Sequence, residues 1–221
     1  MISAVIGSEA LREGGVWSPE FFICLGGDKP DYAYPMVSLR ELVRERREIV
    51  DPQSTDAFGK DYLGLENIEP GTRALMGDLR PSADVKSSAK RFMRGDILYG
   101  RLRPALNKLY LVEGMDEGVC STEIFVLVPD TGVVDPVFLS ELLISVPVNE
   151  EIVSLVRGAS LPRIDLNDFL DMTLPIPPIS VQKEIASYTE TRRREYREAK
   201  ERADRIPDDI RRNLLRMITR G

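Results

Sequence analysis

Residues 95–129 read GDILYGRLRPALNKLYLVEGMDEGVCSTEIFVLVP, and this stretch decides the fold. It contains two apolar runs of strand character, 97–99 (ILY) and 124–128 (IFVLV), of which the first follows a Gly95-Asp96 turn pair. Between the runs lies an arm rich in arginine, proline and lysine, whose cations are Arg101, Arg103 and Lys108. We therefore expect two strands that hold a basic loop.

Charge is unevenly distributed along the chain. The formal net charge is −6 and the pI is about 5.0, which argues against a simple nucleic-acid binder. Residues 73–108 nevertheless carry 9 cations and 3 anions, between acidic flanking segments. Because salt screens repulsion beyond roughly 8 Å, this basic block can still contact phosphate groups. The alternative is a solvated surface with ordinary cations.

Length and composition narrow the class of protein. With 221 residues, the chain has room for one sizeable domain and an extension. Its two cysteines, Cys24 and Cys120, lack zinc or disulfide spacing, so we expect a reduced, cytoplasmic protein with buried thiols. There is no apolar run of membrane length and no signal-peptide pattern. The absence of histidine excludes histidine-based triads and metal sites.

Four motifs follow one another in a fixed order. They are 62–69 (YLGLENIE), the GDIL, RLRP, NK and CSTE pieces of 95–123, 158–164 (GASLPRI), and 174–179 (LPIPPI) with Gln182 and Ile185. Together they resemble the target recognition domain of type I restriction–modification specificity subunits, over about residues 35–205. The resemblance implies an α+β fold: a mixed, β-rich recognition domain with peripheral helices, followed by a long C-terminal spacer helix.

We expect four segments along the chain. Residues 1–34 form an N-terminal extension, whose aromatic residues Trp17, Phe21 and Phe22 pack onto the domain. Residues 35–179 form the target recognition domain, 180–206 the spacer and dimerisation helix, and 207–221 a C-terminal helical tail. Pro207 is expected to end the long helix, because proline removes a backbone donor.

Local patterns predict the elements of the domain. Ser38 and Glu41 form a capping-box pattern that predicts a helix over 39–47. Alternation predicts a strand over 62–68, and helical spacing predicts helices over 137–144 and 149–156. Residues 72–94 lack a firm period and are expected to form a polar loop along DNA, although a flexible surface loop has the same composition.

The candidate DNA-binding residues come from two sources. The basic block supplies cations for phosphate contacts: Arg73, Lys86, Lys90, Arg91, Arg101, Arg103 and Lys108. The resemblance adds residues of the third motif region, which lies close to DNA in the family: Arg157, Ser160 and Arg163.

The helix over 180–206 carries a seam at three- and four-residue steps. Its members are Val181, Ile185, Tyr188, Arg192, Tyr196, Ala199 and Ala203. The resemblance implies that this helix pairs antiparallel with a second copy, and the alternative is that it folds against its own domain. Because the chain has one recognition domain and no internal repeat, it resembles a half-subunit. A symmetric homodimer would read an interrupted palindrome.

No motif in the sequence indicates catalysis. The chain has neither a glycine loop for S-adenosylmethionine, nor an Asn/Asp-Pro-Pro-aromatic tetrapeptide, nor a Walker motif. We expect no cofactor and a non-catalytic subunit that binds double-stranded DNA and a methyltransferase subunit, in a system that can also include a restriction subunit. One alternative is a regulatory protein-interaction module with the same fold and little DNA affinity, which the low pI favours. Another is a specificity domain detached from a fused methyltransferase–nuclease.

Overall fold

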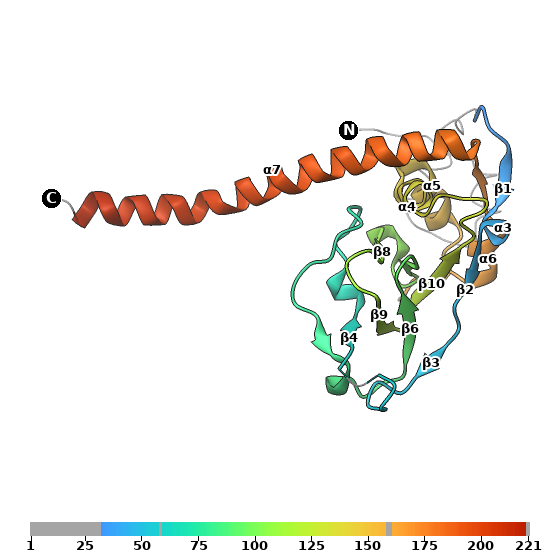
Figure 1. Cartoon of the computed structure of the whole chain (residues 1–221), viewed down its shortest axis with the longest axis horizontal. Helices are drawn as coiled ribbons and strands as arrows, with labels where there is room; N and C mark the ends of the chain where they lie inside the picture. Colours follow the sequence, from blue (N-terminus) through green and yellow to red (C-terminus); the bar gives the residue numbers. More distant parts are fainter. Residues whose placement is uncertain (1–31, 58, 158–160, 220–221) are drawn as a thin grey trace, which may run out of the picture.

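The computed structural model describes residues 32–57, 59–157 and 161–219. A domain built from sheets and short helices carries one long helix, α7 (Ile179–Thr219), which extends far beyond it (Figure 1). Three expectations fall outside the described residues: the packing of the aromatic cluster 17–22, the burial of Cys24 and the DNA contact of Ser160. No described helix is apolar enough over a sufficient length to cross a membrane.

The two predicted strands form the middle of a four-stranded antiparallel sheet. Its order is β2 (Val43–Glu45), β10 (Ile124–Pro129), β7 (Ile97–Gly100) and β8 (Leu109–Leu111). Phe125 lies opposite Tyr99 in the register of β10 and β7, which confirms the pairing expected from 97–99 and 124–128.

A second sheet has five strands of mixed direction. Its order is β3 (Ile49–Val50), β6 (Ala89–Met93), β9 (Glu117–Ser121), β4 (Asp61–Leu63) and β5 (Arg80–Pro81). The β4–β9 pair is parallel, and the other pairs are antiparallel. A short third sheet joins β1 (Met36–Ser38) to β11 (Thr173–Pro175). These mixed sheets with added helices confirm the α+β class.

Strand β10 is buried on both of its faces, which explains its continuous apolar sequence. Phe125 and Leu127 belong to a core shared with the helices, whereas Ile124 and Val126 belong to a core shared with the five-stranded sheet. A strand covered on two sides reads as an apolar run without alternation. Cys120 lies in the second of these cores, so its predicted burial is confirmed.

The peripheral helices pack on the first core. They are α3 (Leu39–Leu42), α4 (Pro136–Ile144), α5 (Val146–Ser154) and α6 (Leu166–Asp171). Asp135 is the N-cap of helix α4, and its carboxylate accepts hydrogen bonds from the amides of Val137 and Phe138 at 2.9 and 3.0 Å. The helices predicted over 137–144 and 149–156 correspond to α4 and α5, and α5 begins three residues earlier than expected.

Three local expectations are wrong because tertiary pairing outweighs local pattern. The helix predicted over 39–47 ends at Leu42, since Val43–Glu45 pairs with β10. Ser38 does not cap it and instead donates its hydroxyl to the Leu170 carbonyl at 3.0 Å. The strand predicted over 62–68 ends at Leu63 and continues as a 3-10 turn, Leu65–Asn67.

Residues 72–94 and Pro207 also differ from expectation. The segment 72–94 is only partly irregular, because it contains β5, the 3-10 turn Ser82–Asp84 and all of β6. Pro207 does not end the long helix: α7 continues through it to Thr219. A helix of 41 residues is about 60 Å long, so the second half of α7 lies well away from the domain (Figure 1).

Candidate nucleic-acid interface

The fold brings together two arginine-bearing segments about 60 residues apart in sequence. The Arg103 amide donates to the Pro162 carbonyl at 2.8 Å, and the Ile164 amide donates to the Arg101 carbonyl at 3.1 Å. Arg157 and Arg163 exchange a further pair of backbone hydrogen bonds. Four of the predicted DNA-binding residues therefore lie on neighbouring backbone. We call them the arginine cluster: Arg101, Arg103, Arg157 and Arg163.

Two members of the arginine cluster are held by carboxylates. Arg163 contacts both oxygens of Glu123, the shortest contact being 2.8 Å. The hydrogen bond from Arg163 is the main cause that lowers the pKa of Glu123, although burial opposes it. Arg157 pairs with Asp168 at 2.9 Å, and its side chain remains 77% exposed. These pairs fix the direction of both guanidinium groups while leaving N–H donors available.

The other two members form no hydrogen bond or close ion pair with a carboxylate within the described parts of the chain, although the charge of Arg101 helps to lower the pKa of Glu123. The Arg101 guanidinium lies 5.2 Å from the centroid of the Phe125 ring, and its buried Nε has no hydrogen-bond partner there. Arg103 is exposed and left-handed, with φ 50°, an uncommon conformation for a residue other than glycine. Both guanidinium groups can therefore donate to an incoming anion without first breaking an ion pair.

Several cations of the basic block are instead used inside the domain. Lys90 is 9% exposed, and its Nζ contacts Glu45 at 3.0 Å and the Ile124 carbonyl at 2.9 Å. The Nζ of Lys108 donates to the Leu65 carbonyl at 2.7 Å. A count of charged residues in the sequence does not distinguish these cations, which bind groups inside the domain, from cations that are free to contact DNA.

The remaining predicted residues are Lys86, Arg91 and Arg73, and none of them forms an ion pair or hydrogen bond with the arginine cluster in the described parts of the chain. Arg91, on β6, pairs with Glu48 at 3.0 Å, and Lys86 is exposed after the 3-10 turn Ser82–Asp84. Arg73 is buried among carboxylates next to α7. Because a buried, paired cation cannot reach a phosphate without losing its partner, burial argues against phosphate contacts from Arg73 and Lys90. The DNA contacts of the exposed residues stay predictions.

Helix α7 presents two neighbouring faces with different surroundings. One face carries Gln182 and Ala186, which are buried against the domain. The Gln182 side chain accepts from the Asp135 amide at 2.8 Å and donates to the Pro177 carbonyl at 2.9 Å. At 3.6 residues per turn, the predicted seam lies roughly 90° away from this face.

The predicted seam therefore divides along its length. Val181 and Ile185 are partly buried at the border with the domain, Ile185 against its core, whereas the later members are exposed: Tyr188, Arg192, Tyr196, Ala199 and Ala203. The same line continues beyond Pro207 as an apolar stripe that includes Ile206, Ile210, Leu214 and Met217, with exposed fractions from 55% to 78%. Asp209 and Asn213 line a shallow groove beside these four residues. Treating Pro207 as a helix end concealed this continuity.

Known proteins that resemble the chain are type I specificity subunits. No family model matches it. The HindI specificity subunit of Haemophilus influenzae is 32% identical over 106 residues, which cover 46% of this chain and 23% of that protein. The EcoDI specificity subunit of Escherichia coli is 27% identical over 130 residues, which cover 58% and 28%. The chain thus matches only about a quarter of the length of these curated relatives.

Solved structures share the fold over a larger part of the chain. The HsdS subunit from Thermoanaerobacter tengcongensis superposes with a TM-score of 0.64 at 25% identity, covering 83% of this chain and 48% of that one. A chain from a study of complex assembly and conformational transition of the type I restriction–modification system gives a TM-score of 0.62 at 24% identity, covering 79% and 45%. The second likeness shows the fold alone.

The fold and site define a β-rich α+β domain that carries a projecting helix and an arginine cluster. In sequence and in fold the chain resembles type I restriction–modification specificity subunits, over a length that fits a single recognition domain. The predicted resemblance is confirmed.

Proposed function

We propose that the chain is a non-catalytic, sequence-specific DNA-recognition subunit that directs a partner methyltransferase to its site. The arginine cluster carries this proposal. Two segments distant in sequence converge there, and Arg101 and Arg103 keep unpaired guanidinium groups that suit phosphate oxygens. Arg157, Arg163 and the exposed Lys86 extend the proposed contact set. Phosphate contacts of this kind position a protein on the duplex, and side chains of neighbouring loops would read the bases.

We further propose that a second copy of the chain covers the apolar stripe of α7. In one antiparallel register, the small residues Ala203 and Ala199 lie against the partner's Ile206 and the partner's Ile210, so that small and large side chains alternate. The same register brings Glu195 near the partner's Arg216 and Arg202 near the partner's Asp209. This charge complementarity favours a second copy, and the dimer would read an interrupted palindrome.

The methyltransferase would dock on α7 and the adjoining surface of the domain. The proposed assembly leaves uncovered the flank of α7 that carries Glu184 and Thr191, which are both exposed and lie roughly 90° around the helix from Lys183 and Arg194. The partner would supply the chemistry, and a restriction subunit would join in systems that have one.

The salt dependence of binding tests the phosphate contacts. Five cations on phosphates predict that log affinity per recognition domain falls with log salt at a slope of about −4.5. Replacing Arg101 and Arg103 with Gln should reduce this slope by about 2, because each lost contact releases about one counterion fewer. The matched control is Lys183→Gln with Arg194→Gln, which removes the same charge from α7. A slope near zero for the assembled wild-type complex would refute the assignment.

Methylation mapping tests the function as a whole. The chain would be co-expressed with a type I methyltransferase subunit, and methylated sites would be mapped across the host DNA. A two-part palindromic site is expected. If the methyltransferase works with another specificity subunit but not with this chain, the result favours the interaction module, a reading that the low pI supports.

A further inference from the structure

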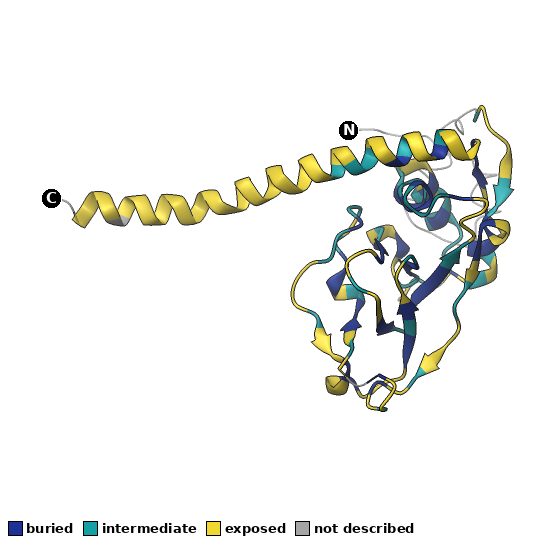
Figure 2. Ribbon diagram, in the orientation of Figure 1, coloured by how far each residue is buried: buried dark blue, intermediate teal, exposed yellow. Residues whose placement is uncertain are grey.

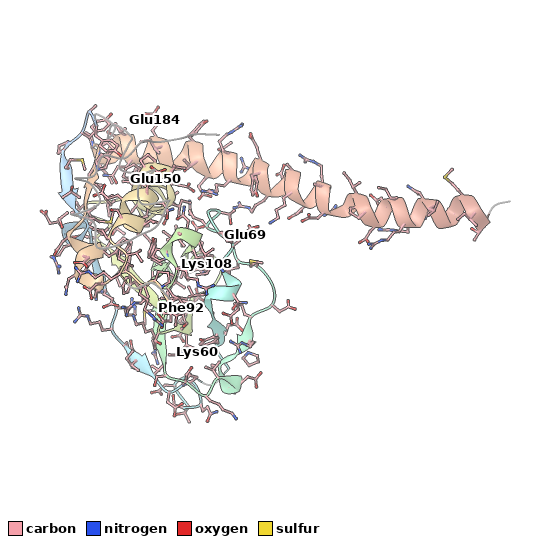
Figure 3. All side chains as sticks on the ribbon, turned by 180° about the vertical axis from the view of Figure 1, so that it is seen from behind. Lys60, Glu69, Phe92, Lys108, Glu150 and Glu184 are labelled. Carbon is pink, nitrogen blue, oxygen red and sulfur yellow. The ribbon has the colours of Figure 1, made fainter. Side chains whose placement is uncertain are left out.

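A set of ion pairs beneath α7 joins four parts of the fold that are distant in sequence. We call it the ionic network, and its members are Glu69, Arg73, Glu113, Glu141, Glu190, Arg193 and Lys200. Glu113 follows β8 and lies 3.7 Å from Arg73 Nη2. Glu69 and Arg73 belong to the loop after the 3-10 turn Leu65–Asn67, and Glu141 belongs to α4. Figure 3 shows Glu69 on the side of the domain that faces α7.

Glu141 is the centre of the network. It accepts hydrogen bonds from Arg193 Nε and Nη2 at 2.7 Å each, and from Arg73 Nη1 at 2.8 Å. Arg73 Nη2 also contacts Glu190 of α7 at 3.0 Å, and Lys200 pairs with Glu69 further along the helix. Two-point contacts between arginine and a carboxylate constrain orientation as well as distance.

The loop that presents Arg73 is itself held in an unusual conformation. Arg73 has a φ of 59°, in the left-handed region that costs a non-glycine residue conformational energy. Two hydrogen bonds fix Gly71 nearby: its amide donates to the Asn107 carbonyl at 2.8 Å, and its carbonyl accepts from Arg193 Nη1 at 3.1 Å. The loop is therefore tied to both the domain and α7.

Burial of the network favours a geometric role over a stabilising one. The Arg73 side chain is 5% exposed, that of Glu141 13% and that of Arg193 20%. Removing such charges from water offsets much of their attraction, so a buried network adds little net stability compared with an apolar contact. What it supplies is one defined orientation of the groups it joins.

The network also marks the last place where ion pairs hold the helix to the domain. Within the described residues, the ion pairs of α7 after Lys200 join residues of the helix to each other. The direction of the projecting half of α7 is consequently set at the network and at the buried contacts of Gln182.

We propose that the ionic network determines the spacing of the DNA site. This rests on the proposed dimer: by fixing the direction in which α7 leaves each recognition domain, the network fixes the separation and rotation of the two domains. Because the dimer is two-fold symmetric, a change in the angle between α7 and its domain occurs in both copies, and the angle between the two domains changes by twice as much. One extra base pair moves a half-site by about 3.4 Å and rotates it by about 36°, so a defined angle selects one spacer length. Arg73, Arg193 and Lys200 are positioning residues in this scheme.

The test compares DNA duplexes that carry the mapped half-sites with native, one-shorter and one-longer spacers. The variant Arg193→Gln with Lys200→Gln removes both cations through which α7 contacts Glu69 and Glu141. Its control, Lys183→Gln with Arg194→Gln, also removes one arginine and one lysine from α7, but on a face roughly 90° from the network. Neither pair belongs to the proposed dimer seam.

For each protein, spacer discrimination is the Kd for the shifted spacer divided by the Kd for the native spacer. In the network variant this ratio should fall by about tenfold or more, which corresponds to about 1.4 kcal/mol. The control should keep the wild-type ratio. A charge reversal gives a second readout: Lys200→Glu should weaken spacer discrimination, and adding Glu69→Lys should restore part of it. If Lys200→Glu acted by unfolding the protein, adding Glu69→Lys would not restore spacer discrimination.

The outcomes separate the two proposals. If the wild-type chain directs no methylation, the proposed function fails. If the wild type methylates one spacing and the network variant keeps the full wild-type Kd ratio, the spacing role is refuted and the proposed function stands. Broadened spacing in the network variant and in the control alike would also refute it, because charge alone would then be responsible.

Discussion

The two halves of α7 share one helix and one periodicity, but they meet opposite surroundings. The half nearer the domain buries Gln182 and Ala186 and takes part in the ionic network. Most of the far half is exposed (Figure 2), and the exposed fractions of Ile206, Ile210, Leu214 and Met217 run from 55% to 78%. Periodicity thus shows that a helix has an apolar face, whereas the environment of that face depends on how far the helix extends past its domain.

The difference indicates that the two halves of α7 have different roles: the near half attaches the helix to the domain, and the far half is a surface for association. Contacts in the near half are polar and directional, which suits a fixed attachment. The exposed residues of the far half are apolar and lie in one line along the helix, and an exposed apolar stripe of this kind marks an interaction surface. Changes in the far half should therefore affect association, and changes in the near half should affect stability and geometry.

The largest effect is expected on dimerisation, from substitutions in the far half of α7. Replacing Ile206 and Ile210 with Glu introduces four charges into the proposed dimer seam, and each lost isoleucine removes about 1.5–3 kcal/mol of burial. The dimer Kd should rise by about a hundredfold or more, as measured by sedimentation or mass photometry. The control, Arg205→Ala with Arg212→Ala, changes exposed residues of the opposite face and should leave the Kd unchanged. A wild-type chain that is monomeric would contradict the proposed role of the far half in association.

A smaller effect, on stability, is expected at Gln182. Replacing it with Ala leaves the Asp135 amide and the Pro177 carbonyl without their partners, which should lower the free energy of unfolding by about 2–3 kcal/mol. Urea denaturation at one fixed protein concentration would measure this, since association adds to apparent stability. Ser187→Ala, on an exposed position of the same helix, is the control. An unchanged midpoint would show that the near half does not anchor α7.

The smallest effect is a pH dependence at Glu141. Burial alone would raise its pKa, but hydrogen bonds from Arg193 and Arg73 outweigh burial and lower the pKa below 4.5. Because the folded-state pKa is depressed, this stabilisation is present above about pH 4.5 and is lost as the pH falls through the folded-state value. Glu141→Gln should cost about 1–2 kcal/mol at pH 7.

The same variant tests the direction of this dependence. The stability difference between wild type and Glu141→Gln should shrink as the pH is lowered below 4.5, because the wild-type carboxylate becomes protonated. Denaturation curves at pH 7 and at two acidic values would measure it. A difference that grows with acidity would contradict the assigned pKa direction.

Much of the domain could be predicted because its central strands are unambiguous. The runs 97–99 and 124–128 are apolar, β-branched or aromatic, and bounded by turn residues, so their local preference agrees with their final pairing. The motif order likewise sufficed to predict the resemblance to specificity subunits, and the four members of the arginine cluster were all among the predicted residues.

The rest depended on contacts between distant residues. Val43–Glu45 continues a helical pattern in sequence, yet it becomes a strand because β10 offers it backbone partners. Lys90 and Lys86 look alike in a charge count, but Lys90 meets Glu45 and the Ile124 carbonyl inside the domain. Neither distinction has a local signal, because each partner lies dozens of residues away.

The sequence by itself determined the paired strands, the helical periodicity of α7 and the resemblance to specificity subunits, since these follow from local preference and ordered motifs. Only the tertiary structure decided which arginines remain free, where Arg73 is buried and which face of α7 meets the domain. The physical reason is that burial and ion pairing are properties of neighbourhoods in space, and the fold creates those neighbourhoods from segments that the chain keeps apart.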